Sequence, residues 1–143
     1  MPSHTEHKIL PYTPEQMFDL VADVARYPEF LPWCIATRIK SSDDGLMIAD
    51  MVIGFKIFRE QFTSRVKVDR PHRIDVTYQN GPFKYLENHW LFEAADNESC
   101  LVDFHVEFEF RSKILEKAIG KVFTEAVHRM VSAFETRAAD LYG

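Results

Sequence analysis

The sequence lacks any apolar run of the ~18 residues that a membrane-spanning helix requires. Its polar start, MPSHTEHK, has no apolar signal-peptide segment. It also has few cysteines, because Cys34 and Cys100 are the only two, and they form neither a CxxC pair nor a metal-ligand spacing. These absences predict a cytoplasmic protein whose thiols stay reduced and whose contact with any membrane is peripheral.

A surplus of basic residues is missing as well. The 17 Lys and Arg residues are outnumbered by 22 Asp and Glu residues, and the net charge of −5 argues against a general nucleic-acid binder. We therefore expect no DNA partner. The chain has 143 residues, 46% of them hydrophobic, which predicts one globular domain spanning residues 1–143.

Catalytic and metal-binding motifs are absent too. There is no G-x-S-x-G nucleophile motif and no glycine-rich phosphate loop, and the six His residues form no HxxxH or HExxH pattern. Glu107 and Glu109 share a strand face that we expect to be solvated, so they do not form a buried pair for acid–base chemistry. We expect no catalytic residue, no metal site, no catalytic cofactor and no enzymatic activity.

The patterns that are present begin with a helix start at residues 13–16, Thr-Pro-Glu-Gln, which has a capping threonine, a proline at the first helical position and a capping-box glutamine. We expect this helix to end near Arg26, because the residue before Pro28 avoids the α conformation. Its apolar face comprises Met17, Phe18, Leu20, Val21 and Val24.

Hydrophobicity then alternates with a period of two, which predicts strands over residues 35–40, 47–53, 55–68, 74–78, 86–92 and 101–111, in addition to a first strand over 4–10. Gly54 is expected to separate two of them. The stretch LVDFHVEFEFR alternates most clearly, and this indicates an antiparallel sheet with one packed face and one wet face.

Residues 112–142 read as one long helix with a wide apolar stripe, interrupted at Gly120, where we expect a close approach or a bend. The whole order predicts an α+β fold in which a curved antiparallel sheet of about seven strands wraps a long C-terminal helix, with two short helices after the first strand. Because such a sheet cannot lie flat against a cylinder, the gap between them must hold side chains or an apolar cavity.

The stretch VADVARYPEFLPWC allows two interpretations. Its Tyr27, Phe30, Leu31 and Trp33 either plug the end of the core or form one lip of the gap, where they would touch a lipid-like ligand or a membrane surface. A stripe of lysines also allows two interpretations. It consists of Lys113, Lys117 and Lys121, which are spaced four residues apart on the predicted C-terminal helix. The stripe is either a solvated helix face or a local basic patch that contacts anionic lipid or ribosomal RNA.

Four stretches of the chain resemble the coenzyme-Q-binding branch of the START-like (polyketide cyclase/dehydrase-type) superfamily. They are VADVARYPEFLPWC, GPFKYLENHWLF, VDFHVEFEFRSKILEKAIGKVF and MVSAFETRAADLYG. That branch also includes the bacterial ribosome-association toxin. The resemblance implies a helix-grip fold with a hydrophobic tunnel. It also implies non-enzymatic ubiquinone binding in support of respiratory electron transfer and quinone synthesis, with peripheral contact at the inner face of the respiratory membrane.

The same resemblance leaves two alternatives open: a toxin-like protein that binds the large ribosomal subunit and inhibits translation initiation, and an aromatase or cyclase of the wider superfamily. For the quinone, the Tyr27 hydroxyl or the Trp33 indole N–H is the expected head-group donor. Residues 81–83, Gly-Pro-Phe, are expected to form a second lip of the gap. The predicted ligand-binding residues are those on the inward faces and at the two lips: Tyr27, Phe30, Leu31, Trp33, Phe83, Trp90, Phe108, Phe123, Val127 and Met130.

Overall fold

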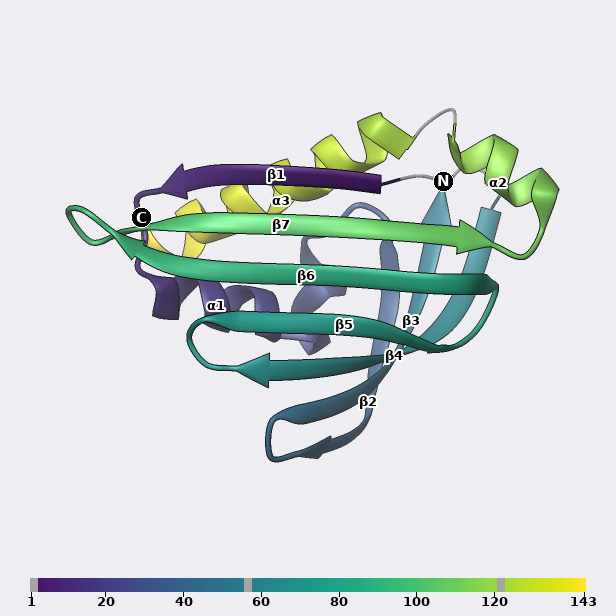
Figure 1. Ribbon diagram of the computed structural model, residues 1–143, viewed down its shortest axis with the longest axis horizontal. Coiled ribbons are helices and arrows are strands. Elements are labelled where there is room, and N and C mark those ends of the chain that lie inside the picture. The colour runs from purple at the N-terminus through teal and green to yellow at the C-terminus, as the bar shows by residue number, and fades with distance from the viewer. Residues whose placement is uncertain (1–2, 56–57, 121–122) are drawn as a thin grey trace.

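A seven-stranded antiparallel sheet forms the frame of the protein in a computed structural model that describes residues 3–55, 58–120 and 123–143. The strands occur in the spatial order β1-β7-β6-β5-β4-β3-β2. Figure 1 shows this order, with the first and last strands of the chain side by side. The strands are β1 (Ser3–Leu10), β2 (Cys34–Asp43), β3 (Leu46–Phe55), β4 (Phe58–Asp69), β5 (Arg73–Asn80), β6 (Phe83–Ala95) and β7 (Ser99–Phe110).

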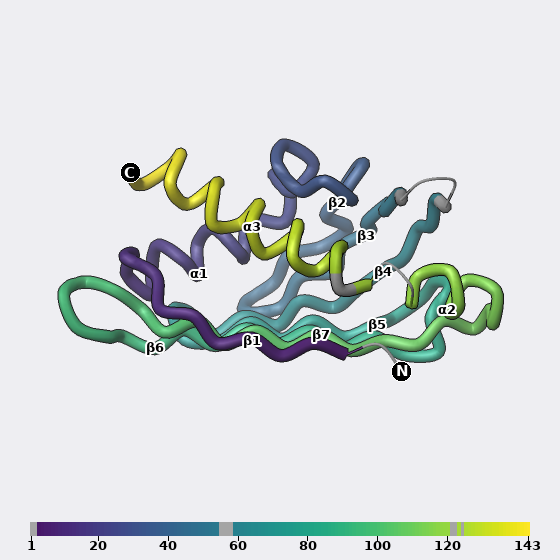
Figure 2. The backbone as a smooth tube through the Cα atoms, turned by 90° about the horizontal axis from the view of Figure 1, so that it is seen from above, coloured from purple at the N-terminus to yellow at the C-terminus, as the bar shows by residue number. Residues whose placement is uncertain are grey.

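The helices lie on one face of this sheet. They are α1 (Pro14–Ala22), the 3-10 helix η1 (Val24–Glu29), α2 (Lys113–Gly120) and α3 (Phe123–Tyr142). Figure 2 shows α1 and α3 over the concave side of the curved sheet. The predicted α+β helix-grip architecture is thereby confirmed, including the two short helices after the first strand.

The start of α1 follows from its sequence. The backbone N–H of Gln16 donates to Thr13 Oγ1 at 3.2 Å, and the Gln16 side chain accepts from the Thr13 N–H at 2.9 Å, so the predicted capping box is present. The predicted end was wrong. The α-helix stops at Ala22, because Asp23 leaves the helical region, and the chain continues through Pro28 as the tighter η1.

Two further predictions need correction. The single helix predicted over 112–142 is described as two helices, α2 and α3, with residues 121–122 outside the described part. We predicted a close approach or a bend at Gly120. Among the described residues a Cβ at Gly120 would meet nothing within 4 Å, so no close approach is found there. Gly54 does not separate two strands but lies inside β3, where its N–H donates to the Trp33 carbonyl at 2.9 Å.

The core lies between the sheet and the helices α1 and α3. The predicted alternation of β7 is confirmed, because Val102, Phe104, Phe108 and Phe110 are all buried on the inward face. Val106 belongs to the same inward set but is only half-buried. Val106 therefore faces inward but is only partly covered by other side chains. This partial burial indicates that the sheet and helix α3 are not fully packed against each other at that position.

Candidate functional site

An apolar cavity of about 280 Å³ occupies the gap between the concave face of the sheet and helix α3. Its floor comes from β3, β4, β5, β6 and β7, and its other walls come from α1, α2, α3 and the segment around η1. Half-buried Val76, Leu86 and Val106 form part of that floor. The cavity therefore exists because the curved sheet bends away from the straight axis of α3.

The structure brings nine of the ten predicted ligand-binding residues to this cavity: Tyr27, Leu31, Trp33, Phe83, Trp90, Phe108, Phe123, Val127 and Met130. Phe30 is the exception. Its ring packs edge-on against Phe134 at 5.4 Å, and the Arg137 guanidinium lies 5.1 Å from the centre of the Phe30 ring. Phe30 instead lines a shallow surface groove beside α3.

The two predicted head-group donors already have backbone partners. The Tyr27 hydroxyl donates to the Val21 carbonyl, and the Trp33 indole N–H donates to the Ala126 carbonyl of α3 at 3.0 Å. Burial, with smaller effects from Cys34 and Asp23, raises the pKa of Tyr27 far above its ordinary range, so its hydroxyl stays neutral. Both side chains thus anchor the η1 segment to the helices and present apolar rings to the cavity.

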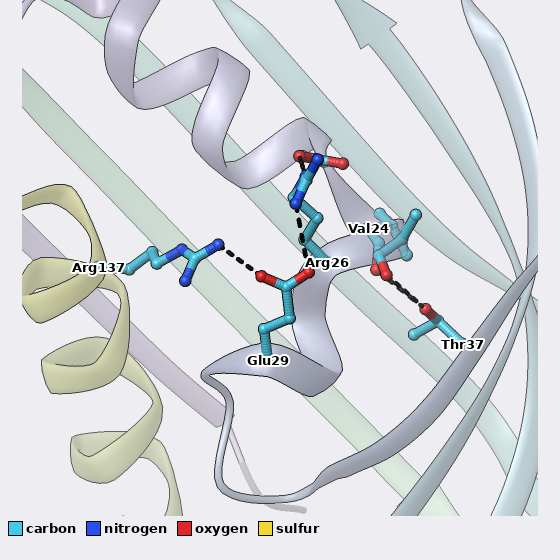
Figure 3. Close-up of polar contacts among 7 residues, drawn as sticks. Val24, Arg26, Glu29, Thr37 and Arg137 are labelled. Atoms are coloured by element: carbon cyan, nitrogen blue, oxygen red, sulfur yellow. Dashed lines mark hydrogen bonds and ion pairs between the residues drawn. The ribbon is translucent and has the colours of Figure 1, made fainter. Parts of the chain in front are cut away.

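Polar contacts hold η1 in place, as Figure 3 shows. Thr37 of β2 donates to the Val24 carbonyl at 3.1 Å, and Arg137 of α3 donates to Glu29 at 2.8 Å. Arg26 contacts the same Glu29 carboxylate at 3.3 Å. These contacts fix the segment that carries Tyr27 and Trp33, so this segment both closes the end of the core and forms a wall of the cavity.

Sequence reasoning missed three polar residues that line the cavity from the sheet, Glu60, Ser64 and Asn88. Ser64 is only 3% exposed, whereas Asn88 is half-buried. Asn88 Oδ1 is buried and has no hydrogen-bond partner among the described residues. A signal for Asn88 was available in the sequence, because it is the one polar side chain on a strand face shared with Leu86, Trp90 and Phe92.

The thiols contribute no charge to this environment. Cys34 lines the cavity and Cys100 lies in the core, and both are free. Burial raises the pKa of each thiol to about 11. Both cysteines are therefore protonated near neutral pH and act as small apolar side chains.

Helix α2 covers one end of the cavity with Leu115 and Ile119 and presents its other side to solvent. Lys113 and Lys117 are exposed on it, and Ile114 between them is 79% exposed. Lys121, the third member of the predicted stripe, lies outside the described residues. In the described part of α2 the stripe is a solvated surface with an exposed apolar side chain beside it.

Residues 10–135 match the family described as polyketide cyclase/dehydrase and lipid transport, and the chain belongs to this family. Its fold is shared with a START superfamily protein from Mycobacterium smegmatis, with a TM-score of 0.82, 16% identity, and coverage of 97% of this chain and 98% of that one. The fold named by the resemblance is thereby confirmed.

Two relatives illustrate the branch. The ribosome association toxin RatA of Escherichia coli strain K12 is 39% identical over 142 residues, which cover 99% of this chain and 90% of that protein. The mitochondrial coenzyme Q-binding protein COQ10 homolog B of Xenopus laevis is 35% identical over 144 residues, which cover 98% of this chain and 59% of that protein. The predicted membership in a branch that contains both kinds of protein is confirmed.

No helix within residues 3–55, 58–120 and 123–143 is long and apolar enough to span a membrane. Over those same residues, no group of three or more His, Cys, Asp or Glu side chains is placed to hold a metal ion.

Proposed function

We propose that this protein binds ubiquinone, or a similar isoprenoid lipid, in the cavity beneath α3 and acts as a non-enzymatic carrier or chaperone that supports respiratory electron transfer and quinone synthesis. The observation that carries the proposal is the apolar cavity itself, about 280 Å³ in volume and lined by the Tyr27–Cys34 segment, the sheet and α3. The relationship to a coenzyme Q-binding protein supports the choice of ligand.

The physical basis is the transfer of a hydrocarbon tail out of water. Burying apolar surface contributes about 25 cal/mol per Å², and a thin isoprenoid chain presents almost only such surface. Met51 and Met130 lie in the walls, and their flexible thioether side chains adapt to a ligand of irregular shape. Among the described lining residues there is no Lys, Arg or His and a single carboxylate, Glu60, so the wall offers no pair of charged groups for acid–base catalysis and favours binding of an apolar ligand.

Ligand binding is tested directly by extracting the purified protein with organic solvent and analysing the extract by mass spectrometry. Both tryptophans of the chain, Trp33 and Trp90, line the cavity, so added short-tailed ubiquinone is expected to quench their fluorescence and raise the melting temperature. Absence of copurified quinone, quenching and thermal protection together would reject the proposal.

A pair of variants makes the test specific to the cavity. Val106→Phe places a larger ring on the cavity floor from β7 and is expected to abolish ubiquinone binding. Leu101→Phe places the same ring on the opposite face of the same strand and is expected to bind like the wild type. Circular dichroism and thermal melting verify that both variants fold. Equal affinity in the two would place the ligand elsewhere.

A second candidate function is binding to the large ribosomal subunit with inhibition of translation initiation. It is favoured by the RatA relative, which aligns with 99% of this chain, and by the exposed Lys113 and Lys117 of α2.

Cosedimentation with ribosomes at low and moderate salt tests this second candidate function. The double variant Lys113→Glu/Lys117→Glu is expected to lose cosedimentation, whereas Lys40→Glu/Lys67→Glu, with an equal charge change on other exposed lysines, is expected to keep it. Failure of the wild type to sediment at either salt concentration would remove this candidate.

A further inference from the structure

Four inward-facing residues, one from each of the strands β4 to β7, form a row beneath the cavity, and only one of the four is polar. The strand register places Val66 of β4 beside Val76 of β5, Val76 beside Asn88 of β6, and Asn88 beside Val106 of β7. All four residues line the cavity. Asn88 is therefore a carboxamide set in a row of valines.

The carbonyl oxygen of this asparagine makes no hydrogen bond to any of the described residues. This Oδ1 atom is buried, and an unsatisfied buried acceptor is destabilising. Asparagine is also disfavoured in strands, whereas valine, which occupies the other three positions, is favoured. A valine at position 88 would suit folding better on both counts, which points to a role for Asn88 outside folding.

Asn88 is also the polar group that is free to serve a ligand in the middle of this cavity. The Tyr27 and Trp33 donors are committed to the Val21 and Ala126 carbonyls. Ser64 is almost fully buried and presents much less surface than half-buried Asn88. A carboxamide donates through Nδ2 and accepts through Oδ1, and rotation about its terminal bond presents either atom to a bound molecule.

We propose that Asn88 is the polar anchor of the cavity and hydrogen-bonds an oxygen of the ligand's head group, while the hydrocarbon part lies along the valines and the aromatic rings. The ligand class is a lipid with an uncharged, oxygen-bearing head, either carbonyl or hydroxyl. No described lining residue is a Lys or Arg, and the one charged lining residue is the acidic Glu60, so phosphate and carboxylate heads are disfavoured. This inference rests on the proposed lipid-binding function and specifies which atoms of the ligand it recognises.

The test compares three probes by displacement of an apolar fluorescent dye: short-tailed ubiquinone, the head-less isoprenoid hydrocarbon squalene, and the carboxylate palmitate. The wild type is expected to bind ubiquinone most tightly and palmitate most weakly. In Asn88→Val the affinity for ubiquinone is expected to fall about 5- to 10-fold, the typical effect of one lost hydrogen bond. The affinity for squalene is expected to stay the same or to rise.

Two further variants and one stability measurement complete the design. Val76→Ala changes the shape of the same row without changing its polarity, so it should alter both affinities by a similar factor and keep their ratio. Asn88→Thr restores a hydroxyl and should recover most of the ubiquinone affinity. Ligand-free Asn88→Val is expected to melt roughly 3–6 °C above the wild type, because it removes an unpaired polar atom.

The outcomes separate this inference from the function on which it rests. An unchanged ratio of ubiquinone to squalene affinity in Asn88→Val would overturn the anchoring role while leaving lipid binding intact. Preference of the wild type for palmitate would overturn the uncharged-head specificity. If the wild type binds neither ubiquinone nor squalene, the proposed lipid-binding function is rejected, and the anchoring role of Asn88 is rejected with it.

Discussion

The indole N–H of Trp33 donates to the main-chain carbonyl of Ala126 at 3.0 Å. This bond joins the segment between η1 and β2 to helix α3, 93 residues further along the chain. Because both residues line the cavity, the bond sets how closely this wall approaches the helix. The tryptophan therefore positions a wall of the site as well as contributing its ring.

Trp33→Phe keeps an apolar ring at this wall but removes the donor. We expect the free energy of unfolding to fall by about 1 kcal/mol, because one partly buried hydrogen bond is lost. Urea denaturation followed by circular dichroism measures the change. The variant retains Trp90 as a fluorescent reporter of the cavity, and an unchanged urea midpoint would show that the bond contributes no stability.

Gly81 is required at the β5–β6 turn. Its φ is +145°, a conformation that L-residues rarely adopt, and a Cβ there would lie 2.6 Å from Phe62 Cβ. We expect Gly81→Ala to lower the free energy of unfolding by roughly 2–4 kcal/mol. Gly120→Ala is the matched control. A Cβ at Gly120 would meet none of the described residues within 4 Å, so this substitution is expected to be neutral or to stabilise by up to ~1 kcal/mol. Equal effects of the two substitutions on the chemical-denaturation midpoint would contradict this.

Asp75 links stability to pH. Partial burial raises its pKa, but hydrogen bonds from Arg73 and His89 outweigh that effect, and the net pKa lies below the ordinary value of 3.8. A carboxylate with a lowered pKa stabilises the fold above its unfolded-state pKa, and this stability is lost as the pH falls through the folded-state value. We expect Asp75→Asn to reduce the loss of stability below about pH 4.

The measurement for Asp75 is the urea midpoint as a function of pH between roughly 2.5 and 6. Asp44→Asn, in the exposed turn between β2 and β3, provides a control with the same chemical change. If both variants keep the wild-type acid profile, the contacts of Asp75 with Arg73 and His89 do not contribute.

The two thiols should react slowly in the folded protein. With a pKa of about 11, roughly one molecule in a thousand carries a thiolate at pH 8, and burial restricts access further. We expect alkylation by iodoacetamide to accelerate by two orders of magnitude or more on unfolding in urea.

Peptide mapping by mass spectrometry distinguishes alkylation at Cys34 from alkylation at Cys100. Bound ubiquinone is expected to slow alkylation of Cys34, which lines the cavity, more than that of Cys100. Fast alkylation in the native state would show that the sites are not buried as described.

Much of the frame could be predicted from the sequence because local chemistry specifies it. The capping pattern at Thr13 fixed the start of α1, and the period-two alternation fixed both the existence of the strands and their inward faces, as in β7. The end of α1 and the continuation of β3 through Gly54 were mispredicted. The predicted long C-terminal helix is described as α2 and α3, on either side of residues that lie outside the described part. Helix and strand ends depend on contacts with the rest of the fold, which propensity alone does not report.

Local pattern is enough to tell which side chains face inward, because a strand alternates its side chains and a helix repeats every 3.6 residues whatever surrounds them. Which of these inward residues pack and which border a cavity depends instead on how the sheet curves relative to α3. Val102 and Val106 occupy equivalent positions in one strand pattern, yet the first is buried and the second is half-buried. The reason is geometric, because a sheet that curves away from a straight helix leaves space beneath only part of its width.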